Sequence, residues 1–349
     1  MKSSYKPEDV RLLLKDISGM VKPQDTEERE KLIQSGKHYC EMLPVEYMPS
    51  QLYMDAYYDA LDKFAGPTAR AVGRLADKVV KQRRKDTVLV SLARAGIPIG
   101  ILLKHYILQK YGVDMPHYAL SIIRGRGIDH NAMQYLLERF VPEQLLFVDG
   151  WIGKGAILKE LQKEIAHYKG VSAEIAVLAD PANVTQLCGT HEDILIPSAC
   201  LNCTVSGLIS RTFLRSDIIG KTDFHGAVYY EELKEKDLSY EFIHAIEREF
   251  SAENLAEEEE AKGSGARETA EIARRFGIDD MNLVKPGIGE TTRVLLRRVP
   301  WKILIDTNHR NDPALFHIIK LAGEKDVPVE EYPLNHYRAC GIIKKMPDA

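Results

Sequence analysis

The sequence lacks long hydrophobic runs and is poor in cysteine. No apolar stretch approaches the roughly 18 residues that a membrane-spanning helix needs, and the N-terminal segment MKSSYKPEDVRLLLKD contains no apolar signal-peptide core. The 5 cysteines are unevenly spaced, which does not fit the framework of a disulfide-rich secreted domain. We therefore expect a cytoplasmic protein with reduced thiols and no membrane association.

A strong excess of one charge is also missing. The formal net charge is −4 for 349 residues. The chain as a whole therefore lacks the positive charge typical of nucleic-acid-binding proteins, and any basic surface must be local. The hydrophobic content of 45% and the charged content of 28% are typical of globular proteins. This length accommodates one large domain or two of ordinary size.

The most informative stretch is LLFVDGWIGKGAIL, at 145–158. Its apolar start predicts a buried strand that ends on an acid, and apolar residues at helical spacing follow. The residues of interest are Asp149, Gly150, Gly153, Lys154, Gly155 and Ala156. Backbone N–H groups of a glycine loop and of a helix N-terminus bind anions. The stretch therefore predicts a cradle for a phosphorylated sugar, whose hydroxyl groups or metal ion the acid could reach.

Two further turns carry arginine among small residues. TVLVSLARAGIPIG predicts a strand followed by the turn Arg94-Ala95-Gly96, where a forked guanidinium can bind phosphate oxygens. A second predicted strand, at 117–123, precedes Arg124 and Arg126, which alternate with glycines in a cationic loop. Each signal is weak alone, because an arginine in a turn is usually just solvated.

Strands and helices alternate between residues 87 and 196, which predicts an α/β fold with a doubly wound, mostly parallel sheet. The strand at 173–178 ends near Asp180, and we expect the last strand at 194–197. Ligands of such sheets bind at the carboxyl ends of the strands. Candidate residues for a second pocket are Asp180, Asn202, Thr204 and Ser206. The alternative is that these small polar residues only cap and pack a helix.

The flanking regions differ in composition from this core. Residues 51–85 predict helix interrupted at Gly66-Pro67, whereas the acidic and Gly-containing stretch that begins at 251 predicts a linker or exposed helix. Residues 280–349 predict a small second α/β unit with a one-signed basic patch. Its members are Lys285, Arg293, Arg297, Arg298 and Lys302. Such a patch suits phosphate contacts with nucleic acid, and a solvated helix face is the alternative.

Two cysteine arrangements suggest other chemistry. Cys40 lies close to His38 in the sequence, which is compatible with a thiol protease, although no oxyanion-hole motif accompanies the pair. Cys200 and Cys203 form a C-x-x-C motif, but a zinc site needs a second pair of ligands. A structural role is the alternative for both pairs.

With these motifs assembled, residues 87–212 resemble the type I phosphoribosyltransferases. LLFVDGWIGKGAIL resembles their phosphoribosyl-pyrophosphate (PRPP) signature, SLARAG their pyrophosphate loop, and RGRG their flexible catalytic loop. Over most of its length the chain is similar to the phosphoribosyltransferase-related proteins of bacterial tellurite-resistance and stress gene clusters, a family often labelled cysteine protease StiP. HYCEMLPVEYMPS and DFHGAVYYEEL also carry this resemblance, and NLVKPGIGETTRVLLRR resembles the L7Ae-like PELOTA RNA-binding domain.

The resemblance implies a division into domains and a set of roles. Residues 1–250 would form a phosphoribosyltransferase-like domain with its core at 87–212, residues 251–279 a charged linker, and residues 280–349 a PELOTA-like RNA-binding domain. PRPP would bind with Mg²⁺, which Asp149 would help to hold through the substrate. Asp149, Arg124 and Arg126 would be catalytic, and the loops at 94–96 and 153–156 would bind the phosphates. RNA and a second copy of the chain are the macromolecular partners considered.

Two positions depart from the family pattern. Gly150 stands where a second acid is usual, so ribose binding by Asp149 alone should be weaker or reorganised. Lys154 replaces a usual threonine and adds a cation next to the 5′-phosphate position, which could compensate or could fit a different ligand. The sequence as a whole predicts a PRPP-dependent phosphoribosyltransferase that acts on a nucleobase-like acceptor and carries an RNA-binding tail. The alternatives are a non-catalytic regulator that senses a nucleotide and binds RNA, and a cysteine protease.

Overall fold

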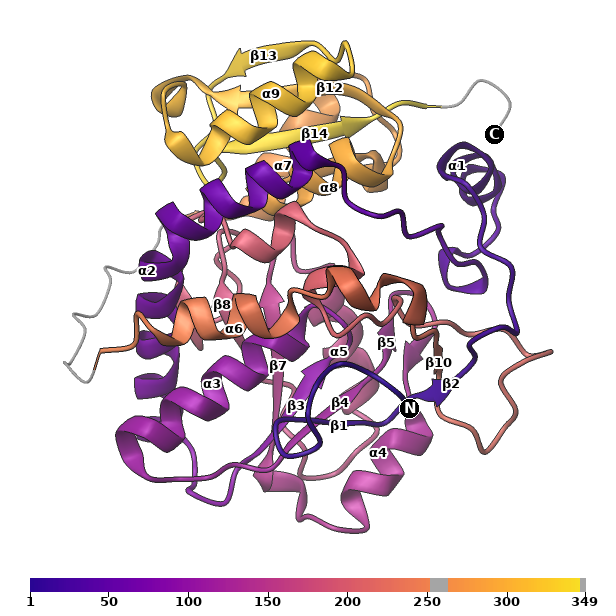
Figure 1. The fold of residues 1–349 in the computed structure, drawn as a ribbon, viewed down its shortest axis with the longest axis vertical. Helices are drawn as coiled ribbons and strands as arrows, with labels where there is room; N and C mark the ends of the chain where they lie inside the picture. The colour runs from indigo at the N-terminus through magenta and orange to yellow at the C-terminus, as the bar shows by residue number, and fades with distance from the viewer. Residues whose placement is uncertain (252–262, 346–349) are drawn as a thin grey trace.

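A six-stranded parallel sheet forms the centre of the protein (Figure 1). The computed structural model describes residues 1–251 and 263–345. The strand order is β1 (Arg11–Leu12), β4 (His117–Leu120), β3 (Val88–Leu92), β7 (Leu145–Trp151), β8 (Ile175–Ala179) and β9 (Cys188–Thr190), with parallel pairing throughout. The predicted α/β fold with a mostly parallel sheet is confirmed.

Helices cover both faces of this sheet. One apolar cluster joins it to α2 (Gln51–Gln82), α3 (Gly96–Tyr111) and α6 (Ser239–Glu247), and a second joins it to α4 (His130–Leu137) and α5 (Ala156–Ile165). Side chains alternate along each strand, so Leu146 and Val148 pack in the first cluster while Leu145 and Phe147 pack in the second. Burial on both faces explains why the strands are nearly continuous apolar runs.

Two predicted element boundaries are wrong. Helix α2 is continuous and contains Pro67 in its interior. Its buried face, which includes Tyr57 and Leu75, runs along the whole helix, and this burial outweighs the roughly 3 kcal/mol that an interior proline costs. The predicted strand at 194–197 is not found in the described residues: Pro197–Cys200 forms a 3-10 helix, and β9 is the edge strand.

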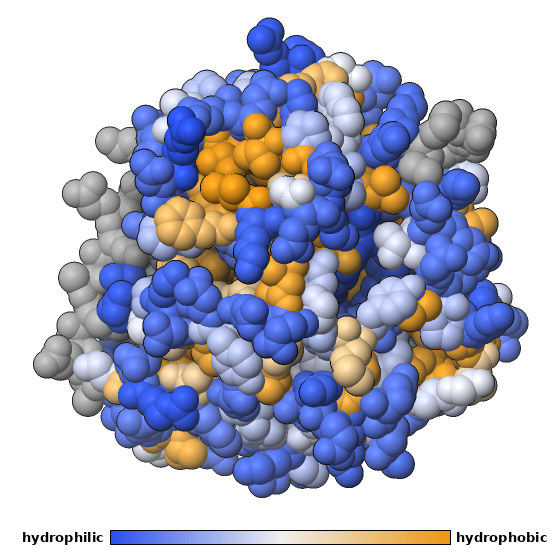
Figure 2. Space-filling model, turned by 45° about the horizontal axis from the view of Figure 1, so that its top comes forward, coloured by the Kyte–Doolittle hydropathy of each residue, from blue (hydrophilic) through white to orange (hydrophobic). Residues whose placement is uncertain are grey.

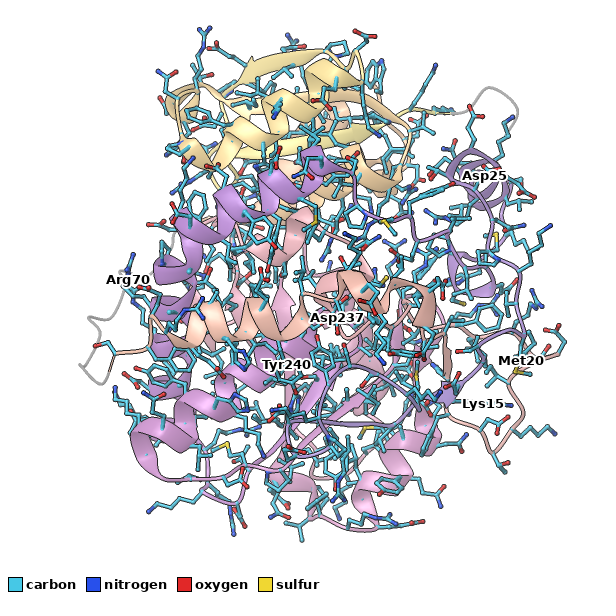
Figure 3. The ribbon with its side chains drawn as sticks, viewed as in Figure 1. Lys15, Met20, Asp25, Arg70, Asp237 and Tyr240 are labelled. Carbon is cyan, nitrogen blue, oxygen red and sulfur yellow. The ribbon has the colours of Figure 1, made fainter. Side chains whose placement is uncertain are left out.

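The N-terminal segment contributes the edge strand β1 to the central sheet and then continues outside this sheet. After β1, strand β2 (Lys15–Asp16) pairs with β10 (Gly226–Ala227), and the Lys15 ammonium lies 2.6 Å from an Asp223 carboxylate oxygen. Helix α1 (Thr26–Gln34) begins after Asp25, whose side chain accepts a hydrogen bond from the Glu28 N–H group. Figure 3 shows Asp25 beside α1 and Lys15 lower on the same side of the molecule.

A smaller α/β unit follows in the C-terminal part of the chain. Its sheet has the order β11 (Val284–Pro286), β14 (Ala339–Ile343), β12 (Pro300–Asp306) and β13 (Val329–Tyr332). Its helices are α7 (Gly265–Arg275), α8 (Ile288–Arg297) and α9 (Phe316–Glu324). The predicted second α/β unit is confirmed. The finer resemblances, to type I phosphoribosyltransferases and to the L7Ae fold, stay predictions.

Helix α7 lies within the segment predicted as a charged linker. Its Ile272 and Ala273 pack in one cluster with Leu304 and Ile342, so α7 is part of the C-terminal unit. The acidic stretch at 252–262 lies outside the described residues.

The surface is mainly hydrophilic, with hydrophobic residues gathered in the upper half of the face in Figure 2. The exposed large hydrophobic side chains of the C-terminal unit are Trp301, Phe316, Ile319 and Val329. None of the helices in the described parts of the chain is long and apolar enough to cross a membrane.

The C-terminal unit is fixed to the glycine loop and to a buried acid of the core. The Lys154 ammonium donates to the carbonyl oxygens of Met281 (2.5 Å) and Val284 (2.9 Å), while the Tyr337 hydroxyl donates to the Gly153 carbonyl (2.5 Å). Asp193 accepts the backbone N–H groups of Ile288 and Arg338, at 3.1 and 2.9 Å. These bonds place α8 opposite the carboxyl ends of the strands.

We expect Tyr337→Phe to lower the free energy of unfolding by about 1 kcal/mol, because it removes a buried hydrogen bond between the two units. Urea unfolding measures this change. Tyr57→Phe is a matched control, since the buried Tyr57 hydroxyl has no hydrogen-bond partner among residues 1–251 and 263–345. Removal of the Tyr57 hydroxyl should leave the free energy of unfolding unchanged or raise it. Equal losses in both variants would contradict the role given to Tyr337.

Candidate functional site

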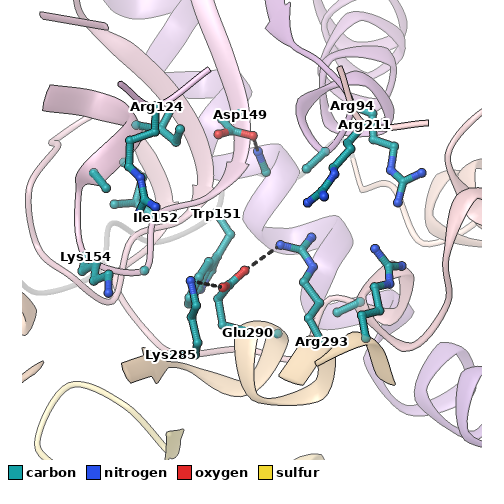
Figure 4. A pocket seen from close by; sticks show the side chains of 18 of the residues that line it. Arg94, Arg124, Asp149, Trp151, Ile152, Lys154, Arg211, Lys285, Glu290 and Arg293 are labelled. Atoms are coloured by element: carbon teal, nitrogen blue, oxygen red, sulfur yellow. Dashed lines mark hydrogen bonds and ion pairs between the residues drawn. The ribbon is translucent and has the colours of Figure 1, made fainter. Parts of the chain in front are cut away.

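A cavity of about 720 Å³ lies where the carboxyl ends of β3 and β7 face α8. This volume is typical of small-molecule sites. Its basic lining residues are Arg94, Arg124, Lys154, Arg211, Lys285, Arg293, Arg297, Arg298 and Lys345, and its acids are Glu30, Asp149, Asp280 and Glu290. Figure 4 shows several of these side chains converging on one space from both units. The cavity is therefore strongly basic although the whole chain is slightly acidic.

The first predicted phosphate loop borders this cavity. Arg94 is engaged within the protein: its guanidinium lies 3.1 Å from a Glu46 carboxylate oxygen and donates to the Ile209 carbonyl at 2.6 Å. Ala95 also lines the cavity. A Cβ atom on Gly96 would lie 2.5 Å from the Val148 carbonyl oxygen, so glycine is needed for the close approach of α3 to β7. Phosphate binding by these residues stays a prediction.

The second predicted loop starts at the carboxyl end of β7. Asp149 accepts a hydrogen bond from the Gly150 N–H group at 2.7 Å, and burial raises the pKa of its carboxyl group to about 6. Gly155 has a φ of 78° and precedes the first residue of α5, Ala156, as the sequence predicts. Lys154 instead points to the C-terminal unit, and burial lowers its pKa to about 8. Its role toward a phosphate stays a prediction.

The cationic loop is divided between two environments. Arg124 lines the cavity, whereas the Arg126 guanidinium pairs with Glu41 at 2.8 Å. No group of three or more His, Cys, Asp or Glu side chains suited to a metal ion occurs in residues 1–251 and 263–345. Mg²⁺ binding therefore stays a prediction that would depend on a substrate's own oxygens.

The four candidate residues of a second pocket do not form one group. Asn202 and Ser206 line the main cavity. Asp180 is buried and accepts the backbone N–H groups of Val184 and Thr185, at 2.7 and 2.8 Å. Thr204 is buried and donates to Asn202 at 3.1 Å. The structure thus gives Asp180 and Thr204 roles in local turns.

The basic patch predicted to bind RNA is turned mostly inward. Four of its residues line the cavity, and they are Lys285, Arg293, Arg297 and Arg298. Lys302 lies apart from them on β12, 2.5 Å from Glu330. The sequence could not show this division, because it depends on which face of α8 the core covers.

The cysteines are all free and buried. The Cys40 sulfur lies 3.0 Å from Nδ1 of His38, whose Nε2 lies 3.0 Å from the Arg124 carbonyl oxygen. Burial raises the pKa of the Cys40 thiol to about 11 and lowers that of His38. The pair is therefore neutral at neutral pH.

A second thiol–imidazole contact lies at the far edge of the sheet. The Cys188 sulfur is 3.3 Å from Nε2 of His191, whose Nδ1 lies 3.1 Å from the Asp180 carbonyl oxygen. Cys188 packs in the apolar cluster beneath α4 and α5 and does not line the cavity. The C-x-x-C cysteines 200 and 203 are buried as well, and burial raises the pKa of the Cys200 thiol to about 12.

The cavity-wall residues that sequence reasoning missed include Tyr39, Trp151 and Arg211. Each lies next to a motif that had been identified, but none has a pattern of its own that would have distinguished it. Gly287 explains the position of Trp151, since a Cβ atom there would lie 2.2 Å from the indole ring.

Fold and site together define an α/β protein in which a core carrying a thiol–imidazole pair is joined to a small basic unit. Residues 3–247 match the family described as "Tellurite-like stress resistance cysteine protease StiP", and residues 263–345 match the PELOTA RNA binding domain. The chain is also 34% identical over 363 aligned positions to "Cysteine protease StiP" of Acinetobacter baylyi, covering 98% of this chain and 94% of that protein. The chain belongs to the StiP family.

This membership corrects the main functional prediction. The family and the A. baylyi relative are both named as cysteine proteases, so the predicted PRPP-dependent phosphoribosyltransferase activity is wrong. The predicted membership of the StiP family and the predicted PELOTA domain are confirmed. The motif order suggested a transferase because a glycine loop after a parallel strand serves anion binding in many unrelated activities.

Asp149→Asn should stabilise the protein at pH 7.5 and leave its stability unchanged at pH 4. The folded state raises the pKa of this carboxyl group from 3.8 to about 6, so stability is lost as pH rises through this window. The gain at pH 7.5 is expected to be about 1–3 kcal/mol. Thermal unfolding at both pH values tests this, with Asp217→Asn, an exposed acid paired with Arg215, as the control. A loss of stability at pH 7.5 would show that the carboxylate is needed in charged form.

Proposed function

We propose that the protein is a cysteine protease with Cys40 as nucleophile and His38 as general base. The observation that carries this proposal is the contact between the Cys40 sulfur and Nδ1 of His38, at 3.0 Å. The names of the family and of the A. baylyi relative support the same class of activity.

The hydrogen bonds of the imidazole ring favour the tautomer that this chemistry needs. The Arg124 carbonyl can only accept, so Nε2 carries the proton and Nδ1 is an acceptor. Nδ1 accepts the Cys40 backbone N–H at 3.4 Å and lies closer, at 3.0 Å, to the thiol whose proton it would take. A base held by a third group in this way is the arrangement of thiol and hydroxyl nucleophiles in hydrolases.

Both groups are neutral at rest, so the proton moves during attack. The S–H bond breaks as the S–C bond to the peptide carbonyl forms, and Nδ1 of His38 takes the proton. The imidazolium then gives this proton to the leaving amine as the C–N bond breaks. Water hydrolyses the resulting thioester and regenerates the thiol.

The position of Cys40 also favours it over Cys188. Tyr39, which precedes Cys40, lines the large cavity. So does Arg124, whose carbonyl contacts the His38 ring. Cys40 is fully buried, so a substrate must displace part of the N-terminal segment to reach it. Burial of this kind keeps the thiol unreactive without substrate.

Cys40→Ala should abolish hydrolysis of an unfolded fluorescent casein, whereas Cys188→Ala should retain it. In the unmodified protein, alkylation of Cys40 by iodoacetamide should be slow at pH 7 and accelerate toward pH 11, because thiolate forms only there. Mass spectrometry of the labelled peptide follows this reaction. Full hydrolysis by Cys40→Ala would remove the proposal.

The C-terminal unit offers a second candidate function, RNA binding. Trp301 is 41% exposed on β12, its ring meets Phe276 edge to face, and the Lys302 ammonium lies 5.5 Å from the indole centroid. Exposed aromatic rings beside cations bind single-stranded RNA by stacking on its bases. The match to the PELOTA RNA binding domain supports this candidate.

Trp301→Ala should weaken binding of a single-stranded oligoribonucleotide by about 1–3 kcal/mol, as expected for loss of one stacked base. Fluorescence anisotropy at fixed salt measures the affinity. Phe316→Ala, which removes another exposed ring of the same unit, is the control and should have little effect. Equal effects of both substitutions would argue against a stacking site at Trp301.

A further inference from the structure

We infer that the cavity between the two units binds a small molecule with a di- or polyphosphate group, with Arg124, Arg211 and Arg297 as its cationic contacts. This goes beyond the proposed function, because neither attack by Cys40 nor base stacking at Trp301 requires a phosphorylated ligand in the cavity.

Three of the carboxylates close to the cavity are paired with particular cations. Glu46 pairs with Arg94 at 3.1 Å, and Glu30 pairs with Arg298 at 2.6 Å. Glu290 pairs with Arg293 at 2.9 Å and lies 4.0 Å from Lys285, and Figure 4 marks both contacts. These three acids contact one set of basic residues and form no ion pair with the other basic residues of the wall in the described parts of the chain.

Arg211 and Arg297 are two of these other basic residues. Within the described residues, neither forms an ion pair with a carboxylate. Arg211 donates to the Tyr39 carbonyl at 3.3 Å, and its Nε is buried without a partner in the part of the chain that the structure describes. Arg297 donates to the Leu201 carbonyl at 2.7 Å. Burial lowers the pKa of Arg211 to about 9 and that of Arg297 to about 10; neighbouring arginines add to both shifts, and the nearby Glu46 offsets part of the shift of Arg297.

A third arginine stands behind them. Arg29 of α1 is 3% exposed, donates to the Arg297 carbonyl at 3.3 Å, and leaves its Nε buried without a partner among the described residues. Burial and Arg298 lower its pKa, and Glu30 and Glu46 offset part of this shift. Three segments far apart in sequence thus bring arginines that form no ion pair, within the described residues, to this side of the cavity.

A buried charge is costly unless a partner neutralises it, so this wall favours an anion of more than one charge. A phosphate group fits because its several oxygens accept forked guanidinium bonds from different directions. Arg124 faces Arg211 from the opposite side of the cavity (Figure 4), so a ligand with more than one phosphate group could meet cations on both sides. The buried Trp151 Nε1, which has no acceptor among the described residues, offers a donor to the rest of the molecule.

The position of the cavity between the two units indicates how a bound ligand would affect their docking. Arg211 comes from the core and Arg297 from α8, so one ligand would contact both units. A ligand that binds only the docked arrangement stabilises it in proportion to occupancy. The same chemistry could come from a free metabolite or from the phosphorylated 5′ end of an RNA, but the enclosed position of the arginines favours the small molecule.

The test is calorimetry on the full chain with pyrophosphate, ADP, uncharged adenosine, and an oligoribonucleotide with or without a 5′-phosphate. We expect pyrophosphate and ADP to bind at micromolar concentration and adenosine not to bind. Arg211→Gln and Arg297→Gln should each weaken ADP binding at least tenfold. Arg84→Gln, which alters an exposed arginine paired with Asp86, should not.

Thermal unfolding separates binding from folding. Without ligand, Arg211→Gln should melt at the same temperature as the unaltered protein or higher, because it removes a buried charge that forms no ion pair within the described residues. It should also lose the stabilisation that ADP gives. Absence of binding by pyrophosphate and ADP, or an unchanged ADP affinity in Arg211→Gln, would overturn the inference. Binding restricted to the 5′-phosphorylated RNA would overturn the assignment to a small molecule.

Discussion

The docking of the C-terminal unit onto the glycine loop is the constraint on which the site depends. Lys154, Tyr337 and Asp193 supply its hydrogen bonds, and each joins a side chain of one unit to backbone groups of the other. Backbone partners fix position and distance without requiring a particular side chain opposite. The loop after β7, whose composition suggests anion binding, therefore also serves as an attachment point. The cavity exists because the second unit is held above the strand ends.

This arrangement concentrates positive charge in a chain of net charge −4. The basic residues of α8 would be an ordinary solvated face on an isolated unit. Placed against the core, they meet Arg94 and Arg211 in an environment where water screens them poorly. Glu30, Glu46 and Glu290 offset part of this repulsion. The charge balance of the interface is thus a property of the two units together.

The sequence predicted those parts of the fold that depend on local pattern. Apolar runs located the buried strands, glycine and small residues located the turns after β3 and β7, and the second unit was recognised from its own alternation of strands and helix. The break at Pro67 was predicted wrongly because long-range packing outweighs the local effect of proline. The contact of Lys154 with the Met281 carbonyl could not be predicted from local sequence, because the two residues are more than a hundred positions apart. The inward orientation of Arg297 could not be predicted either, because it depends on where the whole C-terminal unit is placed. Cys40 and His38, in contrast, are close in the sequence and were noticed there as a pair. Their importance became clear only from the hydrogen-bond geometry of the structure.

Arg124 contributes to both the thiol–imidazole site and the cavity, through different atoms. Its backbone carbonyl holds the His38 ring, and its side chain lines the cavity. Because a carbonyl group is common to all residues, evolution can change the side chain here without changing what orients the imidazole. Ligand preference in the cavity and reactivity at the thiol can therefore diverge independently among relatives, even though one residue stands at the junction of the two sites.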